Sequence, residues 1–206
     1  MKVLLINGSP RPQGCTFTAL SEVARELKAN GVETEIVQIG TKPVAGCIAC
    51  GKCAKTGKCI FDDQVNELAE RLEEFDGFVV GSPVYYASPN GSILAFLDRL
   101  FYVASKKMCY KPAAAIASAR RAGTTASIEA LNKYFAFNQM PIVSSNYWPM
   151  VHGSKAEDVR KDEEGMQIMR VLGSNMEWML KCIEAGKQAG ISCPEKEEKI
   201  KTSFIR

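Results

Sequence analysis

The sequence lacks the features that mark membrane proteins and nucleic-acid-binding proteins. No apolar segment approaches the length of a membrane span, and the N-terminus has no signal-peptide pattern. The net charge is only +3, and the lysines and arginines gather in no basic stripe or tail. We therefore expect a cytoplasmic protein that has no membrane partner and no nucleic-acid partner.

Histidine and the common nucleotide-binding motifs are also scarce. His152 is the only histidine, and with no nucleophile in view it is assigned no role. The loop after the first apolar run contains Gly8 and Gly14 but matches neither GxxxxGK[ST] nor GxGxxG. The lysine that a P-loop places on a triphosphate is therefore missing.

What is present is the composition of an ordinary globular domain. The chain has 206 residues, of which 46% are hydrophobic and 24% are charged. It contains no internal repeat and no linker, so we expect residues 1–206 to form a single domain. A cysteine-rich loop at 46–60 and a charged tail from 194 are its two unusual segments.

Strands and helices are expected to alternate along the chain. Strands are predicted at 2–7, 32–39, 78–81, 112–119 and 141–145. Helices are predicted at 16–29, from Asp62 or Asp63 to Phe75, around 93–104, at 125–137 and at 156–187. This alternation predicts an α/β fold, a doubly wound five-stranded parallel sheet of order 2-1-3-4-5 with helices on both faces. Ligands of such sheets bind at the carboxyl ends of the strands.

The loop after the first strand is predicted to hold a phosphate at the start of the following helix. Backbone N–H groups and the helix dipole favour an anion there. Hydroxyls and one positive charge can add to this site. The candidate residues are Ser9, Arg11, Gly14, Cys15, Thr16 and Thr18. The alternative is a plain strand-to-helix turn that binds nothing.

Two further loops follow the third and fourth predicted strands. The first offers an apolar and aromatic surface on which a planar ring can stack, formed by Pro83, Val84, Tyr85 and Tyr86. The other offers backbone N–H groups and cations, from Ser118, Arg120, Arg121 and Gly123. The alternatives are ordinary packing for the tyrosines and solvated charge for the arginines. Together the three loops suit a planar ring that carries one phosphate, as FMN does.

Three stretches carry a family resemblance over roughly residues 1–150. They are Gly8-Ser9-Pro10-Arg11 with Gly14-Cys15-Thr16, then Ser82-Pro83-Val84-Tyr85-Tyr86, and then Asn90-Gly91-Ser92 leading to Phe96-Leu97-Asp98-Arg99. This combination resembles the NADPH-dependent FMN reductase family of the flavodoxin-like fold. Cys15 departs from it, because this family often has Asn there.

The resemblance implies an enzyme with noncovalent FMN, its phosphate near Ser9, Arg11 and Thr16 and its ring over residues 83–86. NAD(P)H would be the cosubstrate, and a flavin, a quinone or a similar small molecule the electron acceptor. Hydride transfer to the flavin needs no protein acid or base, so no catalytic side chain is predicted. Members of this family are commonly dimers or tetramers, so a homodimer or homotetramer is expected.

Four cysteines in thirteen residues form the most distinctive motif of the chain. Cys47, Cys50, Cys53 and Cys59 spell C-x2-C-x2-C-x5-C, and the first two spacings match a ferredoxin-type run. The motif resembles that of the iron–sulfur flavoproteins, which add a [4Fe–4S] cluster to FMN. Zinc and a metal-free loop are the alternatives. If the cluster is present, an electron carrier that accepts electrons from a ferredoxin is the alternative function.

Overall fold

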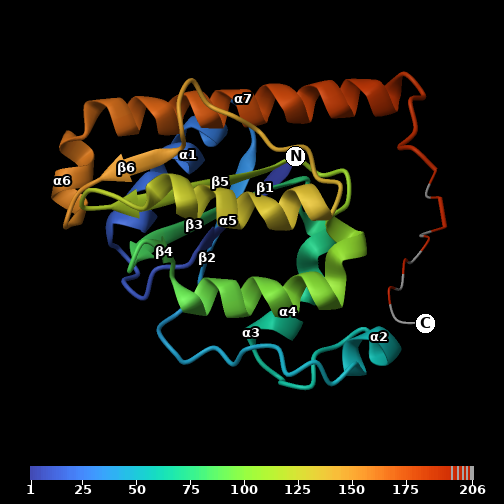
Figure 1. The fold of residues 1–206 in the computed structure, drawn as a ribbon. Coiled ribbons are helices and arrows are strands. Elements are labelled where there is room, and N and C mark those ends of the chain that lie inside the picture. Colours follow the sequence, from blue (N-terminus) through green and yellow to red (C-terminus); the bar gives the residue numbers. More distant parts are fainter. Residues whose placement is uncertain (196, 199, 201, 203, 205–206) are drawn as a thin grey trace.

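A computed structural model describes residues 1–195, 197–198, 200, 202 and 204 (Figure 1). The central sheet contains β1 (Lys2–Asn7), β2 (Glu33–Gln38), β3 (Gly77–Tyr85), β5 (Ala113–Ala119) and β6 (Met150–His152). These strands are parallel, in the order β2-β1-β3-β5-β6. Numbered among themselves they have the order 2-1-3-4-5, so the predicted sheet is confirmed. The two-residue strand β4 (Ser88–Pro89) pairs antiparallel with β3.

Helices cover both faces of the sheet. They are α1 (Cys15–Ala29), α2 (Lys52–Thr56), α3 (Gln64–Arg71), α4 (Gly91–Met108), α5 (Thr124–Phe137), α6 (Ala156–Lys161) and α7 (Glu163–Gln188), and the 3-10 turn η1 (Leu72–Glu74) follows α3. Successive residues of a strand point to opposite faces. Leu4 and Ile6 therefore pack against α3, α4 and α5, whereas Val3 and Leu5 pack against α1 and α7 (Figure 1).

The fifth strand lies later in the chain than expected. Of the predicted segment 141–145, only Ile142 pairs with β5, through one isolated bridge to Ala113. The Ser145 hydroxyl donates to the Ile168 carbonyl at 2.7 Å, and Asn175 Nδ2 donates to the Ser144 carbonyl at 2.8 Å. These bonds to α7 draw the segment away from the sheet, and pairing resumes only in β6.

Two other boundaries also differ from the sequence-based expectation. The long helix predicted at 156–187 is two helices, because Asp162 has φ −77° and ψ 81° and caps α7 by accepting from the Gly165 N–H at 2.9 Å. Strand β3 runs through Pro83, Val84 and Tyr85, which were expected in a loop. Val84 and Tyr85 are strand because β4 pairs with them, and Pro83 is strand because it pairs with Ser118 of β5. Asp63 is the N-cap of α3, as one of the two expected candidates.

No helix within the described residues combines the length and apolarity needed to cross a bilayer. The charged tail expected from 194 falls partly on residues 196, 199, 201, 203, 205 and 206, which lie outside the description.

Candidate functional site

Hydrogen bonds join the first two of the three predicted loops. The Gly8 N–H donates to the Gly81 carbonyl at 2.8 Å, and Asn90 Nδ2 donates to the Gly8 carbonyl at 2.9 Å. A side chain at Gly8 would meet the Gly81 oxygen at 2.8 Å, so only glycine allows this approach. The loop after β1 is therefore fixed against the carboxyl end of β3.

The third loop meets both of the others. Thr16 Oγ1 lies 2.8 Å from Ser118 Oγ, and both side chains are buried. Gly123 has φ +88°, and a Cβ there would lie 2.7 Å from Val84 Cγ1 and 2.9 Å from the Ala87 Cα. The three loops expected to converge at one edge of the sheet are thus in direct contact.

The helices that begin at this edge fall into two groups. Asn90 caps α4, and its Oδ1 accepts from the Ser92 N–H at 2.9 Å. In contrast, the N-cap residues of α1 and α5 are Gly14 and Gly123, and neither glycine can supply a capping side chain. The first N–H groups of these two helices have no acceptor within the helix, so they can bind an anionic or carbonyl-bearing ligand.

The predicted phosphate residues occupy different positions around the start of α1. Ser9 is buried, and its hydroxyl accepts from the Arg11 N–H at 3.1 Å, whereas Arg11 is exposed. The Thr18 hydroxyl donates to the Gly14 carbonyl at 3.0 Å, so it stabilises the loop from one turn inside the helix. Cys15 Sγ lies 3.5 Å from the Gly153 carbonyl. Burial raises the pKa of the Cys15 thiol, so it stays neutral and does not repel an anion.

The aromatic loop is a tight hairpin between β3 and β4. Tyr86 and Ala87 form its turn, with φ values of +47° and +67°, which non-glycine residues rarely adopt. Tyr86 is fully exposed, and Tyr85 is about half exposed at 46%. Arg120 and Arg121 are exposed on the neighbouring loop. The two tyrosines thus form an open aromatic surface beside the loop contacts.

A pair of side-chain amides, the buried Asn7 and the half-buried Gln38, supports the first loop and is not part of the sequence-based site. Asn7 Oδ1 accepts from the Ser9 N–H at 3.1 Å, and Asn7 Nδ2 donates to Gln38 Oε1 at 2.6 Å. Gln38 Nε2 in turn donates to the Ser9 carbonyl. The available signal was a polar residue, Asn7, at the end of an otherwise apolar strand.

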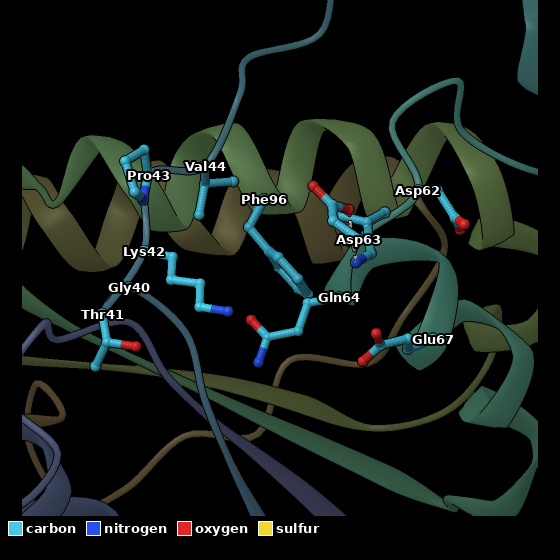
Figure 2. Close-up of a pocket in the computed structure, with 11 residues that line it drawn as sticks. Gly40, Thr41, Lys42, Pro43, Val44, Asp62, Asp63, Gln64, Glu67 and Phe96 are labelled. Carbon is cyan, nitrogen blue, oxygen red and sulfur yellow. Dashed lines mark hydrogen bonds between the residues drawn. The ribbon is translucent and has the colours of Figure 1, made fainter.

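A cavity of about 460 Å³ lies next to the first loop, because Gly40 in its wall lies beside the Gly8 carbonyl and Pro10. It is bounded by residues 40–44 after β2, by the start of α3 and by Phe96 of α4. Lys42 and Gln64 extend toward each other inside it (Figure 2). None of the predicted flavin-site residues lines this cavity, so it is separate from the predicted flavin site.

The four cysteines of the predicted metal site line one small cavity of about 30 Å³, together with residues of α4. All four are free thiols. Within the described part of the chain, however, no three His, Cys, Asp or Glu side chains are placed to hold a metal ion. The four thiols therefore share a cavity, although no three of them are positioned around one metal ion. As a donor set, four thiols beside a cationic side chain fit an iron–sulfur cluster.

Cys59 is held far more firmly than the other three cysteines of this site. Its backbone N–H donates to Asn66 Oδ1 at 2.8 Å, and Asn66 Nδ2 donates to its carbonyl at 3.2 Å. Arg99 Nε donates to Cys59 Sγ at 3.2 Å. Cys47 and Cys50 are exposed in an irregular segment, and Cys53 lies on the one-turn helix α2.

The lysines of the cysteine loop are not all free to offset charge on a cluster. Lys58 Nζ lies 2.6 Å from Glu70 Oε1, and this hydrogen bond raises the pKa of Lys58. Arg99, which the sequence-based site did not include, places a positive charge in direct contact with one of the thiols, because its Nε donates to Cys59 Sγ.

Comparison with known proteins agrees with this architecture. An iron-sulfur flavoprotein of Methanocaldococcus jannaschii is 30% identical over 196 residues, which cover 89% of this chain and all of that protein. An iron-sulfur flavoprotein of Methanosarcina thermophila is 31% identical over 177 residues, which cover 82% of this chain and 90% of that one. Among solved structures, an archaeal flavodoxin superposes with a TM-score of 0.60 at 13% identity, over 88% of this chain and 99% of that one. A structure described as a flavone reductase superposes with a TM-score of 0.68 at 16% identity, over 89% of this chain and 64% of that one.

These structural matches establish the flavodoxin-like fold. The family model described as NADPH-dependent FMN reductase matches residues 1–155. The chain belongs to the NADPH-dependent FMN reductase family.

Proposed function

We propose that this protein is an FMN-dependent oxidoreductase that takes electrons from NAD(P)H and passes them to a small acceptor such as a flavin or a quinone. The observation that carries the proposal is the contact of the three loops at the carboxyl edge of the sheet, through Asn90–Gly8 and Thr16–Ser118. Bound FMN would supply the two-electron chemistry, because its ring accepts and releases electrons reversibly.

The chain's own residues bind and orient the cofactor in this proposal. The uncapped start of α1, with Ser9, Arg11 and Thr16 around it, would hold the phosphate. Tyr85 and Tyr86 would cover the ring with an apolar surface that limits access of water. The uncapped start of α5 after Gly123 would place N–H donors at the edge of the ring. None of these residues needs to transfer a proton.

The phosphate site is tested with Thr16→Val, which keeps the shape of the side chain and removes its hydroxyl. FMN and riboflavin are titrated into the apoprotein by fluorescence, because riboflavin has the same ring without the phosphate. We expect FMN affinity to fall about tenfold, equal to about 1.4 kcal/mol, and riboflavin affinity to stay unchanged. Ser118→Ala is the control, because it breaks the same Thr16–Ser118 hydrogen bond and leaves the Thr16 hydroxyl in place. An equal loss for both flavins would contradict the phosphate placement.

We infer a second cofactor, an iron–sulfur cluster, from the four thiols that line one cavity. Cys47, Cys50, Cys53 and Cys59 would be its ligands. The relatives named iron-sulfur flavoproteins support this inference. With a cluster, the protein could instead be an electron carrier that a ferredoxin reduces. The test is purification without oxygen, followed by iron and sulfide assays and by comparison of NAD(P)H with reduced ferredoxin as donor.

The homodimer or homotetramer implied by the family resemblance stays a prediction. Light scattering during size-exclusion chromatography measures the mass of the particle, and a single chain of 22.6 kDa would contradict it.

A further inference from the structure

Arg99 is the largest side chain in the fully buried core, with 1% of its surface exposed. All five N–H donors of its guanidinium have an acceptor. Nη1 and Nη2 bind the Asp63 carboxylate at 2.8 and 2.7 Å, in a bidentate pair. The same two nitrogens donate to the Ala45 and Phe61 carbonyls at 3.3 Å, and Nε donates to Cys59 Sγ at 3.2 Å.

These partners surround the cysteine segment. Ala45 precedes Cys47 by two residues, and Phe61 follows Cys59 by two. The Arg99 guanidinium therefore hydrogen-bonds the chain on both sides of the cysteine motif and links it to α4. The Phe61 ring also covers the guanidinium, whose carbon lies 5.0 Å from the ring centroid. Asp63 belongs at once to this ion pair and to the N-cap of α3.

Arginine is seldom fully buried in a protein core. Burying a charge is costly unless it is paired and hydrogen-bonded. A planar fork with five fixed donors can reach a carboxylate, two carbonyls and a sulfur together, whereas the ammonium of a lysine cannot. The identity of residue 99 is therefore constrained by the cysteine segment as well as by the core.

We propose that Arg99 is a positioning residue of the cysteine site. It presents Cys59 Sγ as the preformed first ligand of the cluster, and its Nε–H donates to that sulfur in the assembled site. This inference rests on the proposed cluster. Asn66 assists through its two hydrogen bonds to the Cys59 backbone, while the exposed Cys47 and Cys50 would complete the ligand set from the irregular segment.

The hydrogen bond and the positive charge have a measurable consequence. An N–H donor to a ligating sulfur, and a cation beside it, favour the more negative reduced state of a cluster and so raise its reduction potential. Removal of Arg99 is therefore expected to lower the potential, to reduce the amount of cluster that assembles, or both. FMN content should not change, because the flavin loops contact the other end of α4.

The experiment compares wild type, Arg99→Lys and the double variant Asp63→Ser with Arg99→Met. Lysine keeps the charge but cannot form the fork. The double variant removes both members of the ion pair, so no charge is left buried without a partner, and serine retains an N-cap for α3. Arg71→Lys is the matched control, because Arg71, on the surface of α3, makes a bidentate pair with Glu35 of β2.

Each protein is purified without oxygen, checked for folding by circular dichroism, and assayed for iron, sulfide, FMN and cluster potential. In Arg99→Lys and in the double variant, we expect at least half of the iron to be lost, or a tenfold shift of the reduction equilibrium, about 59 mV for one electron. Arg71→Lys should match wild type.

A folded Arg99→Lys or double variant with wild-type iron content and potential would overturn the positioning role. The double variant provides the same readout if Arg99→Lys does not fold. Wild-type protein that holds FMN but no iron or sulfide would instead remove the proposed cluster, and the inference with it. The iron and sulfide content of the wild-type protein therefore shows whether the proposed cluster or the positioning role of Arg99 has failed.

Discussion

Replacement of Asn90 by serine should weaken FMN binding without unfolding the protein. Asn90 has two separable functions in the structure. Its Oδ1 caps α4 at the Ser92 N–H, and its Nδ2 holds the buried Gly8 carbonyl, both at 2.9 Å. Serine is also a good N-cap, so Asn90→Ser keeps the first function. The shorter side chain cannot reach Gly8, and only the link between the loops is lost.

The expected size of the effect follows from the burial of these groups. A typical hydrogen bond contributes about 1 kcal/mol net, and a buried acceptor left without a donor costs about 1–3 kcal/mol. Asn90 is 6% exposed and Gly8 is buried, so water does not readily replace the lost donor. If about 1.4 kcal/mol of this cost falls on the FMN complex, the dissociation constant rises tenfold.

The assay is FMN fluorescence titration of the apoprotein, together with urea unfolding. Asn138→Ser is a matched control, because Asn138 Nδ2 donates to the Ser105 carbonyl at 3.0 Å and also joins a helix end to α4. Both variants should lose about 1 kcal/mol of stability. Only Asn90→Ser should lose FMN affinity. Equal FMN affinity in the two variants would refute the conclusion that the Gly8 contact positions the phosphate loop.

Three further variants probe other parts of the fold. Gly123→Ala should lower the free energy of unfolding by about 2–3 kcal/mol, since alanine disfavours φ +88° and its Cβ would meet Val84; urea unfolding measures this. Tyr86→Gly should stabilise the apoprotein by up to about 1 kcal/mol by relieving φ +47°, yet weaken FMN binding, and unchanged FMN affinity would contradict the ring placement. Glu35→Gln tests a pKa that the Arg71 hydrogen bonds lower from 4.5 to about 2. This depressed pKa stabilises the fold above pH 4.5, and the contribution is lost as the pH falls toward 2. The variant should therefore lose about 1 kcal/mol at neutral pH and show a flatter unfolding profile between pH 4.5 and 2.

The sequence was informative wherever structure depends on neighbours in the chain. The run from Lys2 to Asn7 and the glycines that follow it predict a strand, a loop and a helix start, and all three are confirmed. Topology then places the later loops at the same edge, because parallel strands end together. The contact between Thr16 and Ser118, 102 residues apart, is a consequence of that rule.

The sequence was uninformative where a residue's structure or role depends on a partner that is distant in the chain. Ile142 and Val143 have strand propensity, but they form only one isolated bridge to β5, because the bonds of Ser144 and Ser145 to α7 draw the chain away from the sheet directly after them. The role of Arg99 depends on a carboxylate 36 residues earlier and on a thiol 40 residues earlier. No local pattern identifies such partners, so the sequence indicates Arg99 only as part of a family motif.

The helix α4 joins the two proposed cofactor sites and predicts how they are coupled. Asn90 at its start holds the flavin loop, and Arg99 holds the cysteine segment nine residues later, about 13 Å along the helix axis. Phe96 and Leu97 between them are buried in the core, which keeps this part of the helix in place. Substitutions that are this far apart and share no partner usually act additively. We therefore expect Asn90→Ser to lower FMN affinity equally in wild type and in Arg99→Lys, and iron content or cluster potential to change only with Arg99→Lys. The loss of FMN binding free energy caused by Asn90→Ser is compared in wild type and in Arg99→Lys. A difference of more than about 0.5 kcal/mol between the two would show that the helix transmits a change from one site to the other.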